Sequence, residues 1–120
     1  MEAALHVLQE RQCEGRRIAV LGDMLELGSR AMAEHYRVGR LAAVAADLVL
    51  AYGTHSERII TGAVTGGMSA KCALHYDDQD EMAQALYRMA RPGDVLLFKG
   101  SRGMEMEKVL GAFLKLLENS

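Results

Sequence analysis

Four short apolar runs alternate with segments of helical spacing, and this alternation constrains the fold of the 120-residue chain more than any other feature. The runs, each of strand length, cover residues 18–21, 48–52, 72–76 and 95–98. A short apolar run bounded by turn residues is typical of a strand that is buried on both faces of a parallel sheet. Because helices alternate with such strands, we predict an α/β fold with three layers, α/β/α, and a mainly parallel sheet.

The segments around the strands predict helices, and several of them carry a recognisable start signal. Ser29 is placed to cap the second helix, whereas Thr54 with Glu57 and Asp78 with Glu81 have the spacing of capping boxes. The expected helices run over residues 2–14, about 30–46, from Thr54 to near Gly66, from Asp78 to just before Pro92, and about 104–117. No long polar linker and no internal repeat separates these elements, so we expect a single domain over residues 1–120.

The connections between the strands constrain their order. Because crossovers between parallel strands are right-handed, the simplest doubly wound order is 3-2-1-4, with the first and fourth strands as neighbours. The chain then winds outward in opposite directions from that pair, and ligands of open α/β sheets bind beyond the carboxyl ends of the strands at such a point. We therefore predict that the loops after residues 18–21 and 95–98 face each other and form the site.

Composition argues against several classes of function. The net charge of −2, without a basic stripe, disfavours a nucleic-acid partner, and no apolar run approaches the roughly 20 residues that a membrane span needs. Cys13 and Cys72 are far apart, and the first residues lack the pattern of a signal peptide, which together predict reduced thiols in a cytoplasmic protein. Because the sequence has no Cys/His cluster, we expect no metal site.

The loop after the first strand contains two glycines, Gly22 and Gly28, on either side of two carboxylates. It matches neither a Walker loop nor the GxGxxG pattern, so it does not by itself predict triphosphate binding. Asp23 and Glu26 are suited to orient a ribose, an ammonium group or a bound cation. Alternatively, Asp23 caps a turn and Glu26 is only solvated. His35, inside the next helix, is either a ligand contact or a surface or half-buried helix residue.

The loop after the fourth strand reads Lys99-Gly100-Ser101-Arg102-Gly103 and carries the sharper signal. Its glycines let backbone N–H groups turn toward a ligand, and the start of a helix follows, which together favour an anion. Lys99 adds a point charge, Arg102 adds a bidentate fork for a carboxylate or a phosphate, and Ser101 can donate or accept a hydrogen bond. The alternative interpretation is a solvated basic turn in which Ser101 caps the last helix.

Residues in both loops, and between them, match a family pattern. The chain reads LGDMLELG over residues 21–28, has His35 with Val38-Gly39 in the next helix, and ends its second strand at Tyr52-Gly53. It then reads PGDVLLFKGSRGMEME over residues 92–107. This set of motifs resembles the C-terminal domain of the Mur ligases, and among them the MurF type. The resemblance covers essentially the whole chain.

The resemblance implies a Rossmann-like fold and a part in a three-domain enzyme of peptidoglycan synthesis. Such a ligase uses ATP and Mg²⁺ to activate the peptide carboxylate of UDP-N-acetylmuramoyl-tripeptide (UDP-MurNAc-tripeptide), and the amine of D-alanyl-D-alanine (D-Ala-D-Ala) then forms an amide. The C-terminal domain closes over the central P-loop domain, helps to hold ATP and receives the incoming dipeptide. Since this chain has no Walker loop, the resemblance places no catalytic residue within it and assigns ATP and Mg²⁺ mainly to the missing central domain.

The family pattern also implies roles for individual residues. The segment Lys99–Arg102 is expected to bind the dipeptide carboxylate and nearby phosphate charge. Asp23 and Glu26 are expected at the mouth of the cleft, toward ATP or the dipeptide ammonium, with His35 between the two loops. The glycines that would shape these loops are Gly22, Gly28 and Gly103. Because the first helix begins without an N-cap, we also expect the N-terminal and central domains to precede Met1.

Two other classes of function stay open from the residues alone. A phosphoacceptor signalling module of the receiver type also places an acid after the first strand (Asp23), acids after the third strand (Asp77, Asp78) and a lysine after the last one (Lys99). Against it, only one acid follows the first strand, and the strand count is one short. A simple nucleotide-binding module without chemistry is the other alternative.

Overall fold

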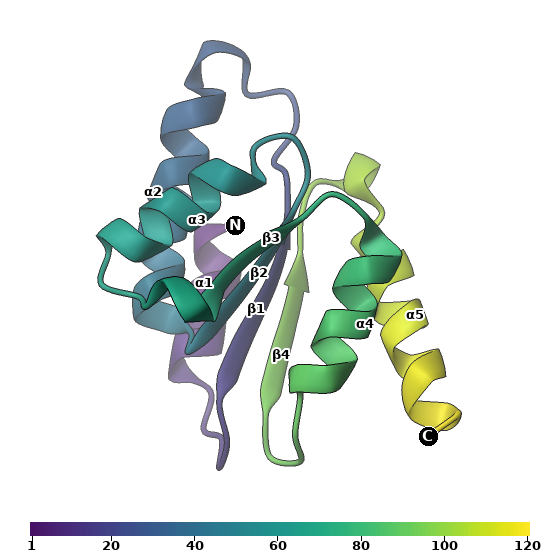
Figure 1. Cartoon of the computed structure of the whole chain (residues 1–120). Helices are drawn as coiled ribbons and strands as arrows, with labels where there is room; N and C mark the ends of the chain where they lie inside the picture. The colour runs from purple at the N-terminus through teal and green to yellow at the C-terminus, as the bar shows by residue number, and fades with distance from the viewer.

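The computed structural model describes all 120 residues and shows a four-stranded sheet with five α-helices around it (Figure 1). In chain order the elements are α1 (Glu2–Glu10), β1 (Arg17–Gly22), α2 (Ala31–Ala45), β2 (Leu48–Tyr52), α3 (Ser56–Thr65), β3 (Ala73–Tyr76), α4 (Gln79–Met89), β4 (Val95–Lys99) and α5 (Met106–Glu118). Short 3₁₀ turns cover Gly28–Arg30, Ala70–Cys72 and Arg102–Met104. None of the helices has the length and apolar character that crossing a membrane requires.

All strand pairs are parallel and the order is β3-β2-β1-β4, which confirms the predicted α/β class and strand order. Leu21 of β1 pairs with Lys99 of β4, and Gly22 pairs with Tyr52 of β2, so these three strands end at nearly the same level. The loops that follow them leave the same edge of the sheet, at the upper ends of the strands in Figure 1.

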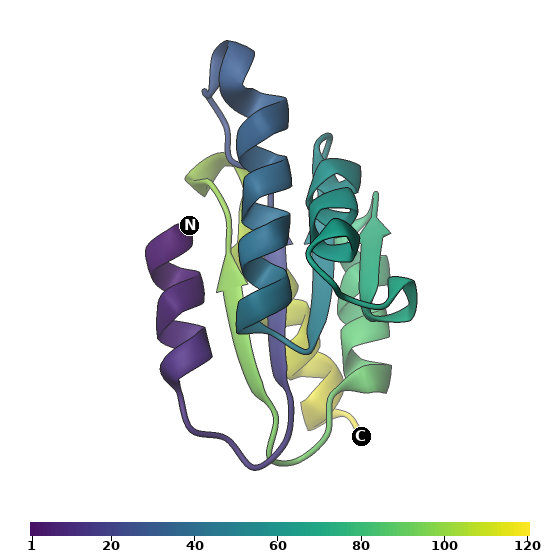
Figure 2. The same ribbon diagram turned by 90° about the vertical axis from the view of Figure 1, so that its left-hand side faces the viewer.

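Helices cover both faces of the sheet, which gives the fold three layers. α1, α2 and α3 lie on one face, whereas α4 and α5 lie on the other (Figure 2). β1 supplies side chains to both layers, with Ala19 and Leu21 packed among the first group and Ile18 and Val20 among the second. None of these four residues has exposed surface, as expected of a central strand in a parallel sheet.

α2 and α3 cross with their backbones nearly in contact, at Gly39 of α2 and Gly62 of α3. A Cβ at Gly39 would lie 2.0 Å from the carbonyl oxygen of Ile59, and one at Gly62 would lie 2.1 Å from that of Tyr36. No side chain fits at either crossing point, so the two helices form one tightly packed unit. This unit fixes the first turns of α2, which carry His35, relative to the start of α3.

The first helix ends earlier than the sequence predicts. α1 stops at Glu10 rather than near residue 14, because the backbone becomes extended at Arg11. The guanidinium of Arg17, at the start of β1, donates hydrogen bonds to the carbonyl oxygens of Leu8 and Arg11. Helix ends leave such carbonyls without partners, so Arg17 stabilises the early end of α1 from outside the helix.

Only one of the three predicted N-caps is confirmed. Asp78 caps α4, because its carboxylate accepts backbone N–H groups from the first turn of that helix. Ser29 lies in a 3₁₀ turn and makes no capping bond, so α2 begins without a side-chain cap. The predicted capping box at Thr54 is wrong, because α3 begins at Ser56. The N–H of its N-cap residue, His55, donates to the carboxylate of Asp23 in the loop after β1.

Candidate functional site

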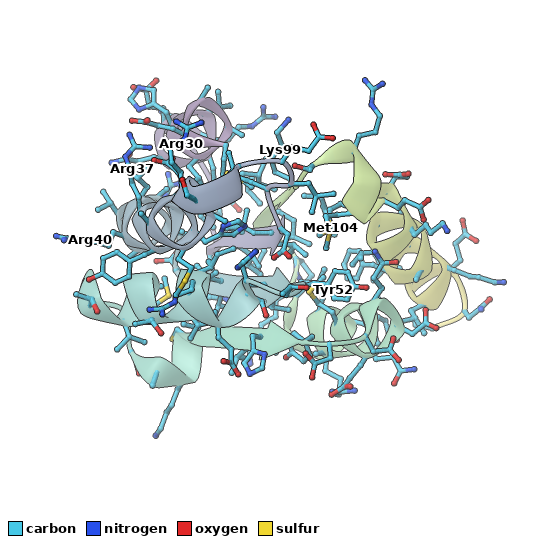
Figure 3. The ribbon with its side chains drawn as sticks, turned by 90° about the horizontal axis from the view of Figure 1, so that it is seen from above. Arg30, Arg37, Arg40, Tyr52, Lys99 and Met104 are labelled. Carbon is cyan, nitrogen blue, oxygen red and sulfur yellow. The ribbon has the colours of Figure 1, made fainter.

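The loops that follow β1, β2 and β4 lie together at the carboxyl edge of the sheet, which faces the viewer in Figure 3. Lys99 ends β4 and Tyr52 ends β2, and the end of β1 lies between them. The winding direction of the chain reverses between β1 and β4. Because ligands of open α/β sheets bind at such a reversal, this edge is the place to search for a site.

A cavity of about 490 Å³ opens beside the loop that follows β4. We call residues Lys99–Gly103 the basic loop. The cavity is lined by four residues of this loop together with two methionines, namely Lys99, Gly100, Ser101, Arg102, Met1 and Met24. Met24 comes from the loop after β1, so the cavity lies between the two loops that the sequence brings together.

Lys99 and Arg102 keep their charges free. Both side chains are exposed, and neither forms an ion pair with a carboxylate of the chain. Two cationic side chains in one short loop are suited to bind a carboxylate or a phosphate.

Ser101 fastens the basic loop to the loop after β1. Its backbone N–H donates to the carbonyl oxygen of Asp23 at 3.0 Å, and its hydroxyl oxygen accepts the N–H of Leu25 at 2.7 Å. The hydroxyl proton is still available, so Ser101 can donate to a ligand while it holds the two loops together. The alternative in which Ser101 caps the last helix is wrong, because its side chain makes no capping bond.

The glycines of the two loops allow close packing where β1 and β4 end. A Cβ at Gly100 would lie 3.0 Å from the Cα of Gly22, and one at Gly22 would lie 2.7 Å from Sδ of Met106 in α5. A Cβ at Gly103 would meet the side chain of Leu25 at 2.7 Å. The backbone of Gly22 therefore leaves little room for a side chain at Gly100, whereas a side chain at Gly22 or Gly103 would meet the flexible ends of Met106 and Leu25.

The helix after the basic loop does not complete an anion site, which corrects the prediction of a helix that begins near residue 104. The 3₁₀ turn Arg102–Met104 leads to Glu105, whose backbone is left-handed with φ +50, and α5 begins only at Met106. The side chain of Glu105 pairs with Lys108 in the first turn of α5. The Glu105 carboxylate pairs with Lys108 without capping the helix, and the residues that line the cavity come from the basic loop and not from α5.

Asp23 is buried in the fold. Only 2% of its surface is exposed, and its carboxylate oxygens accept the backbone N–H of His55 at 3.0 and 3.2 Å. His55 is the N-cap residue of α3, so a side chain from the loop after β1 caps a helix 32 residues further along the chain. The contact combines a hydrogen bond with the favourable effect of a negative charge at a helix N-terminus.

His35 is completely buried in α2 and hydrogen-bonded at both ring nitrogens. Nε2 accepts the backbone N–H of Met24 at 2.9 Å and therefore carries no proton, because an amide N–H only donates. Nδ1 carries the proton and donates it to the carbonyl oxygen of Ala31 at 2.6 Å. The ring also packs against that of His55, with centroids 4.6 Å apart. His35 is thus a neutral residue whose polar atoms are all used within the fold.

The residues singled out from the sequence therefore fall into separate groups. Lys99 and Arg102 face a cavity with free charges, whereas Asp23 and His35 lie beneath the loops that frame it. Glu26 is exposed, with a left-handed backbone at φ +64, and forms no ion pair. The neighbouring turn at Gly28 also has a positive φ, of +57.

Sequence reasoning missed two parts of this edge. Met1 and Met24 line the cavity of the basic loop, and no pattern in the sequence distinguishes them from core methionines. A second, polar cavity of about 420 Å³ lies beyond the ends of β2 and β3, lined by Tyr52, Gly53, Thr54, Ser56, Glu57, His75 and Asp77. The sequence singles out several of these residues, among them Asp77 and Tyr52-Gly53, but does not combine them into a site.

Comparison with known proteins shows similarity in sequence and fold. A family model described as "Mur ligase, glutamate ligase domain" matches residues 1–102. The chain is 33% identical over 111 residues to the UDP-N-acetylmuramoyl-tripeptide–D-alanyl-D-alanine ligase of Bacillus subtilis (strain 168), and 36% identical over 115 residues to that of Escherichia coli (strain K12). These alignments cover 92% and 93% of this chain but only 24% of each relative, so the chain spans about a quarter of the relatives' length.

Two solved structures resemble the chain over nearly all of its elements. A crystal structure of MurF ligase from Thermotoga maritima in complex with ADP has a TM-score of 0.78 at 33% identity, covering 97% of this chain and 25% of that one. A crystal structure of MurF from Acinetobacter baumannii has a TM-score of 0.81 at 29% identity, covering 96% of this chain and 25% of that one.

Proposed function

The chain belongs to the Mur ligase family, and from this membership we propose that it is the C-terminal domain of an ATP-dependent ligase that adds D-Ala-D-Ala to UDP-MurNAc-tripeptide. The proposal is supported by the family match over residues 1–102 and by relatives whose names state this activity. Because the reaction builds a peptidoglycan precursor, we propose that the enzyme acts in bacterial cell-wall synthesis and is located in the cytoplasm.

In this proposal the domain works with other domains of a longer chain. The relatives are far longer than these residues and carry the matching segment at their C-termini. We assign UDP-MurNAc-tripeptide and the phosphate-binding loop to the N-terminal and central domains, which residues 1–120 do not contain. The domain described here receives the dipeptide and closes the cleft against the central domain.

The basic loop is the proposed binding site for the dipeptide carboxylate. Arg102 supplies a planar fork that matches a carboxylate, and Lys99 supplies a point charge that also suits phosphate oxygens of ATP. The observation that carries this assignment is that both charges are exposed and unpaired beside a cavity of about 490 Å³. Glu26, the exposed acid of the facing loop, is the proposed partner of the dipeptide ammonium or of the ATP ribose.

ATP and Mg²⁺ are the proposed cofactors of the whole enzyme. ATP supplies the phosphoryl group that activates the peptide carboxylate for attack by the dipeptide amine. The basic loop fits phosphate oxygens through its two exposed cations, Lys99 and Arg102. No three His, Cys, Asp or Glu side chains of the chain lie together so as to hold a metal ion, and we therefore assign the Mg²⁺ ligands to the central domain.

The phosphoacceptor alternative receives no support from the geometry. A phosphoacceptor carboxylate has to be open to its phosphoryl donor, yet Asp23 is 2% exposed and both of its oxygens lie against the N–H of His55. The family match points to the ligase as well. We therefore retain the ligase domain as the proposed function.

A domain replacement tests this proposal. Residues 1–120 are joined to the N-terminal and central domains of the Bacillus subtilis ligase in place of its matching segment, and the same ligase is also truncated before that segment. With UDP-MurNAc-tripeptide, D-Ala-D-Ala, ATP and Mg²⁺, we expect the chimera to form the amide and the truncated enzyme to form none. A chimera with native circular dichroism that makes no more product than the truncated enzyme would contradict the proposal.

The choice of amine tests the role of the basic loop in the same chimera. D-Ala-D-Ala is compared with D-alanyl-D-alaninamide, which keeps the ammonium group and lacks the carboxylate. We expect the amide analogue to raise KM at least about tenfold, since a charge-assisted hydrogen bond is worth roughly 1.5–3 kcal/mol. Equal KM values for the two acceptors would contradict the proposed contact between the basic loop and the dipeptide carboxylate.

A further inference from the structure

Three successive residues after β1 are each fastened to another part of the fold. Asp23 accepts the N–H of His55, the N-cap residue of α3, through its carboxylate and the N–H of Ser101 through its carbonyl oxygen. Met24 donates its N–H to Nε2 of His35 in α2. Leu25 donates its N–H to the hydroxyl oxygen of Ser101. These hydrogen bonds connect the loop after β1 to α2, α3 and the basic loop.

We infer that Asp23 and His35 are positioning residues for the basic loop, which act on Arg102 through Ser101 and do not touch a ligand. The inference goes beyond the binding contacts proposed above, and it rests on the proposed function only in what it says about ligation. Its structural part stands on the hydrogen bonds of this chain alone.

Neither residue is open to a substrate, because Asp23 is 2% exposed and His35 is fully buried. His35 is 0% exposed, with a partner at each ring nitrogen, and its Nε2 lies 3.9 Å from Oδ1 of Asp23. Gly53 shows how closely the structure is built around the Asp23 carboxylate, because a Cβ at Gly53 would lie 2.5 Å from it. The tight fit around both side chains favours a positioning role over a ligand contact.

The two cations of the basic loop depend on this support to different degrees. Lys99 is the last residue of β4 and pairs with Leu21, so the sheet itself fixes its backbone. Arg102 lies beyond the strand, and the segment before it is held by the two bonds of Ser101 to the loop after β1. Removing Asp23 or His35 should therefore displace Arg102 and leave Lys99 in place.

Amide hydrogen exchange of the 120-residue chain, followed by NMR, tests the structural part. In Asp23→Ala and His35→Ala we expect the amides of Leu25 and Ser101 to exchange about tenfold faster, the factor that one net hydrogen bond provides. Asp78→Ala is the matched control, because it also removes a carboxylate that caps a helix, but on α4 at the other face of the sheet. Unchanged exchange at Ser101 in both variants would overturn the inference.

Milder variants decide the question if the alanine variants do not fold. Asp23→Asn keeps one acceptor oxygen for α3, and His35→Gln offers an amide oxygen to the N–H of Met24. If the alanine variants fold, we expect the exchange rate of the Ser101 amide in the milder variants to lie between the wild-type and alanine rates. If only the milder variants fold, we expect this rate to be measurably higher than in the wild type. Wild-type exchange at Ser101 in both milder variants would overturn the inference in that case.

Steady-state kinetics of the ligase chimera separate positioning from a general loss of stability. We expect His35→Gln to raise KM for D-Ala-D-Ala by about tenfold, since small displacements of a binding group have effects of this order, and to change kcat less. In an Arg102→Ala background the same substitution should not raise KM further, because the residue through which it acts is absent. Equal increases in KM in both backgrounds would overturn the route through Arg102.

The two proposals fail in different ways. A wild-type chimera that does not ligate would contradict the proposed function, and the exchange rates of Leu25 and Ser101 would still decide the positioning role. A chimera that ligates, loses activity in Arg102→Ala and keeps wild-type KM in His35→Gln would leave the proposed function intact and overturn the positioning role.

Discussion

The loop after β1 and the basic loop after β4 leave the same edge of one sheet, yet they use their charged residues in opposite ways. Asp23 is 2% exposed, and both of its carboxylate oxygens lie within hydrogen-bond distance of a backbone N–H. Lys99 and Arg102 are exposed and have no ion-pair partner. The loop after β1 uses Asp23 to join elements of the fold and leaves only Glu26 exposed and unpaired, whereas the basic loop keeps both of its charges available.

Side-chain length and the sign of the charge explain this difference. The short carboxylate of Asp23 reaches only the neighbouring backbone, where α3 presents an N–H group and the positive end of its dipole. Long cationic side chains instead carry their charge out to water. Because a buried charge is costly unless it is paired, burial with a partner marks a structural role, and exposure without one leaves a charge free for a ligand.

Of the changes proposed for the two loops, displacing the Asp23 carboxylate should have the largest effect, a loss of folding stability. Gly53→Ala places a Cβ 2.5 Å from that carboxylate in a backbone with φ +125. We expect the free energy of unfolding to fall by about 3 kcal/mol, from backbone strain together with a weakened buried hydrogen bond. Urea denaturation followed by circular dichroism measures this loss.

Gly67→Ala is the matched control for Gly53→Ala. Gly67 also has a positive φ, of +109, but a Cβ there would have no atom within 4 Å. It therefore reports the backbone strain without the displaced carboxylate, and its loss should be clearly smaller. Equal losses in the two variants would mean that the contact between Asp23 and α3 adds nothing to stability, and the contrast between the two loops would disappear.

Arg102→Ala should affect ligation while leaving the fold unchanged. In the ligase chimera we expect kcat/KM for D-Ala-D-Ala to fall about tenfold or more, because a charge-assisted hydrogen bond is worth roughly 1.5–3 kcal/mol. The free energy of unfolding should change by less than about 0.5 kcal/mol, as is usual for an exposed side chain. Lys99→Ala should behave similarly, with more of the loss in kcat if Lys99 contacts phosphate.

Two variants serve as controls for the basic loop. Arg40→Ala removes an exposed arginine of α2, which Figure 3 places away from Lys99, and Glu107→Ala removes an exposed acid in the first turn of α5. Both should ligate at the wild-type rate. If Arg102→Ala and Lys99→Ala also ligate at that rate across dipeptide concentrations, the basic loop is a turn without a binding role.

The opposite end of β4 offers a smaller, pH-dependent effect. Burial alone raises the pKa of Asp94, but hydrogen bonds from the backbone N–H groups of Arg16 and Arg91 and from the Arg16 guanidinium outweigh it and hold the pKa below its ordinary value. A carboxyl whose pKa is lowered by folding stabilises the fold above the unfolded value of about 3.9 and loses that contribution as the pH falls through the folded pKa.

Urea midpoints measured from neutral pH downward test this linkage. We expect wild-type stability to decline below about pH 4, and Asp94→Asn to show a shallower decline, because an amide does not titrate there. Asp94, like Asp23, is a buried carboxylate with backbone partners, so its behaviour extends the comparison to the other edge of the sheet. Parallel pH profiles for the two proteins would contradict the assigned cause.

Glu26→Gly should produce the smallest change in the free energy of unfolding, and this change should be a stabilisation. Glu26 holds φ +64, which costs a residue with a Cβ roughly 1–2 kcal/mol, whereas glycine gains freedom in the unfolded chain, so we expect a net stabilisation of at most about 1 kcal/mol. Lower kcat/KM together with higher stability would group Glu26 with the basic loop. Glu105→Gly, at φ +50, is the control and should leave ligation unchanged.

The order of strands was predictable because it depends on local patterns and on the handedness of crossovers. Apolar runs identified the strands, and Asp78 was recognised as a cap because it binds N–H groups two and three residues ahead. The cap of α3 was not recognisable, because Asp23 lies 32 residues before the N–H that it binds. Capping patterns in a sequence identify contacts between residues within one helical turn, and they give no information on contacts between distant loops.

The position of the two candidate loops was predictable to the same extent. Strand order alone placed Lys99 and Arg102 beside the reversal point, where the cavity lies. The burial of Asp23 and His35 depends instead on how α2 and α3 pack, at the glycine crossing of Gly39. A charged residue after a strand looks the same in the sequence whether it faces water or another helix, and only the tertiary packing separates the two cases.

The position of β4 beside β1 has a consequence for how the chain comes to be folded. The bond from the N–H of Arg16 to the Asp94 carboxylate joins residues 78 positions apart, and the whole β1–β4 ladder has this long range. Before β4 and α5 have been synthesised, β1 has one unpaired edge. Ile18 and Val20 then lack the α5 side chains that cover them in the folded domain. Long-range parallel pairing is slow, and unpaired edges attract other chains. A nascent chain released before β4 is therefore prone to aggregate, and β4, which emerges long after β1, completes the sheet and brings the basic loop to its edge.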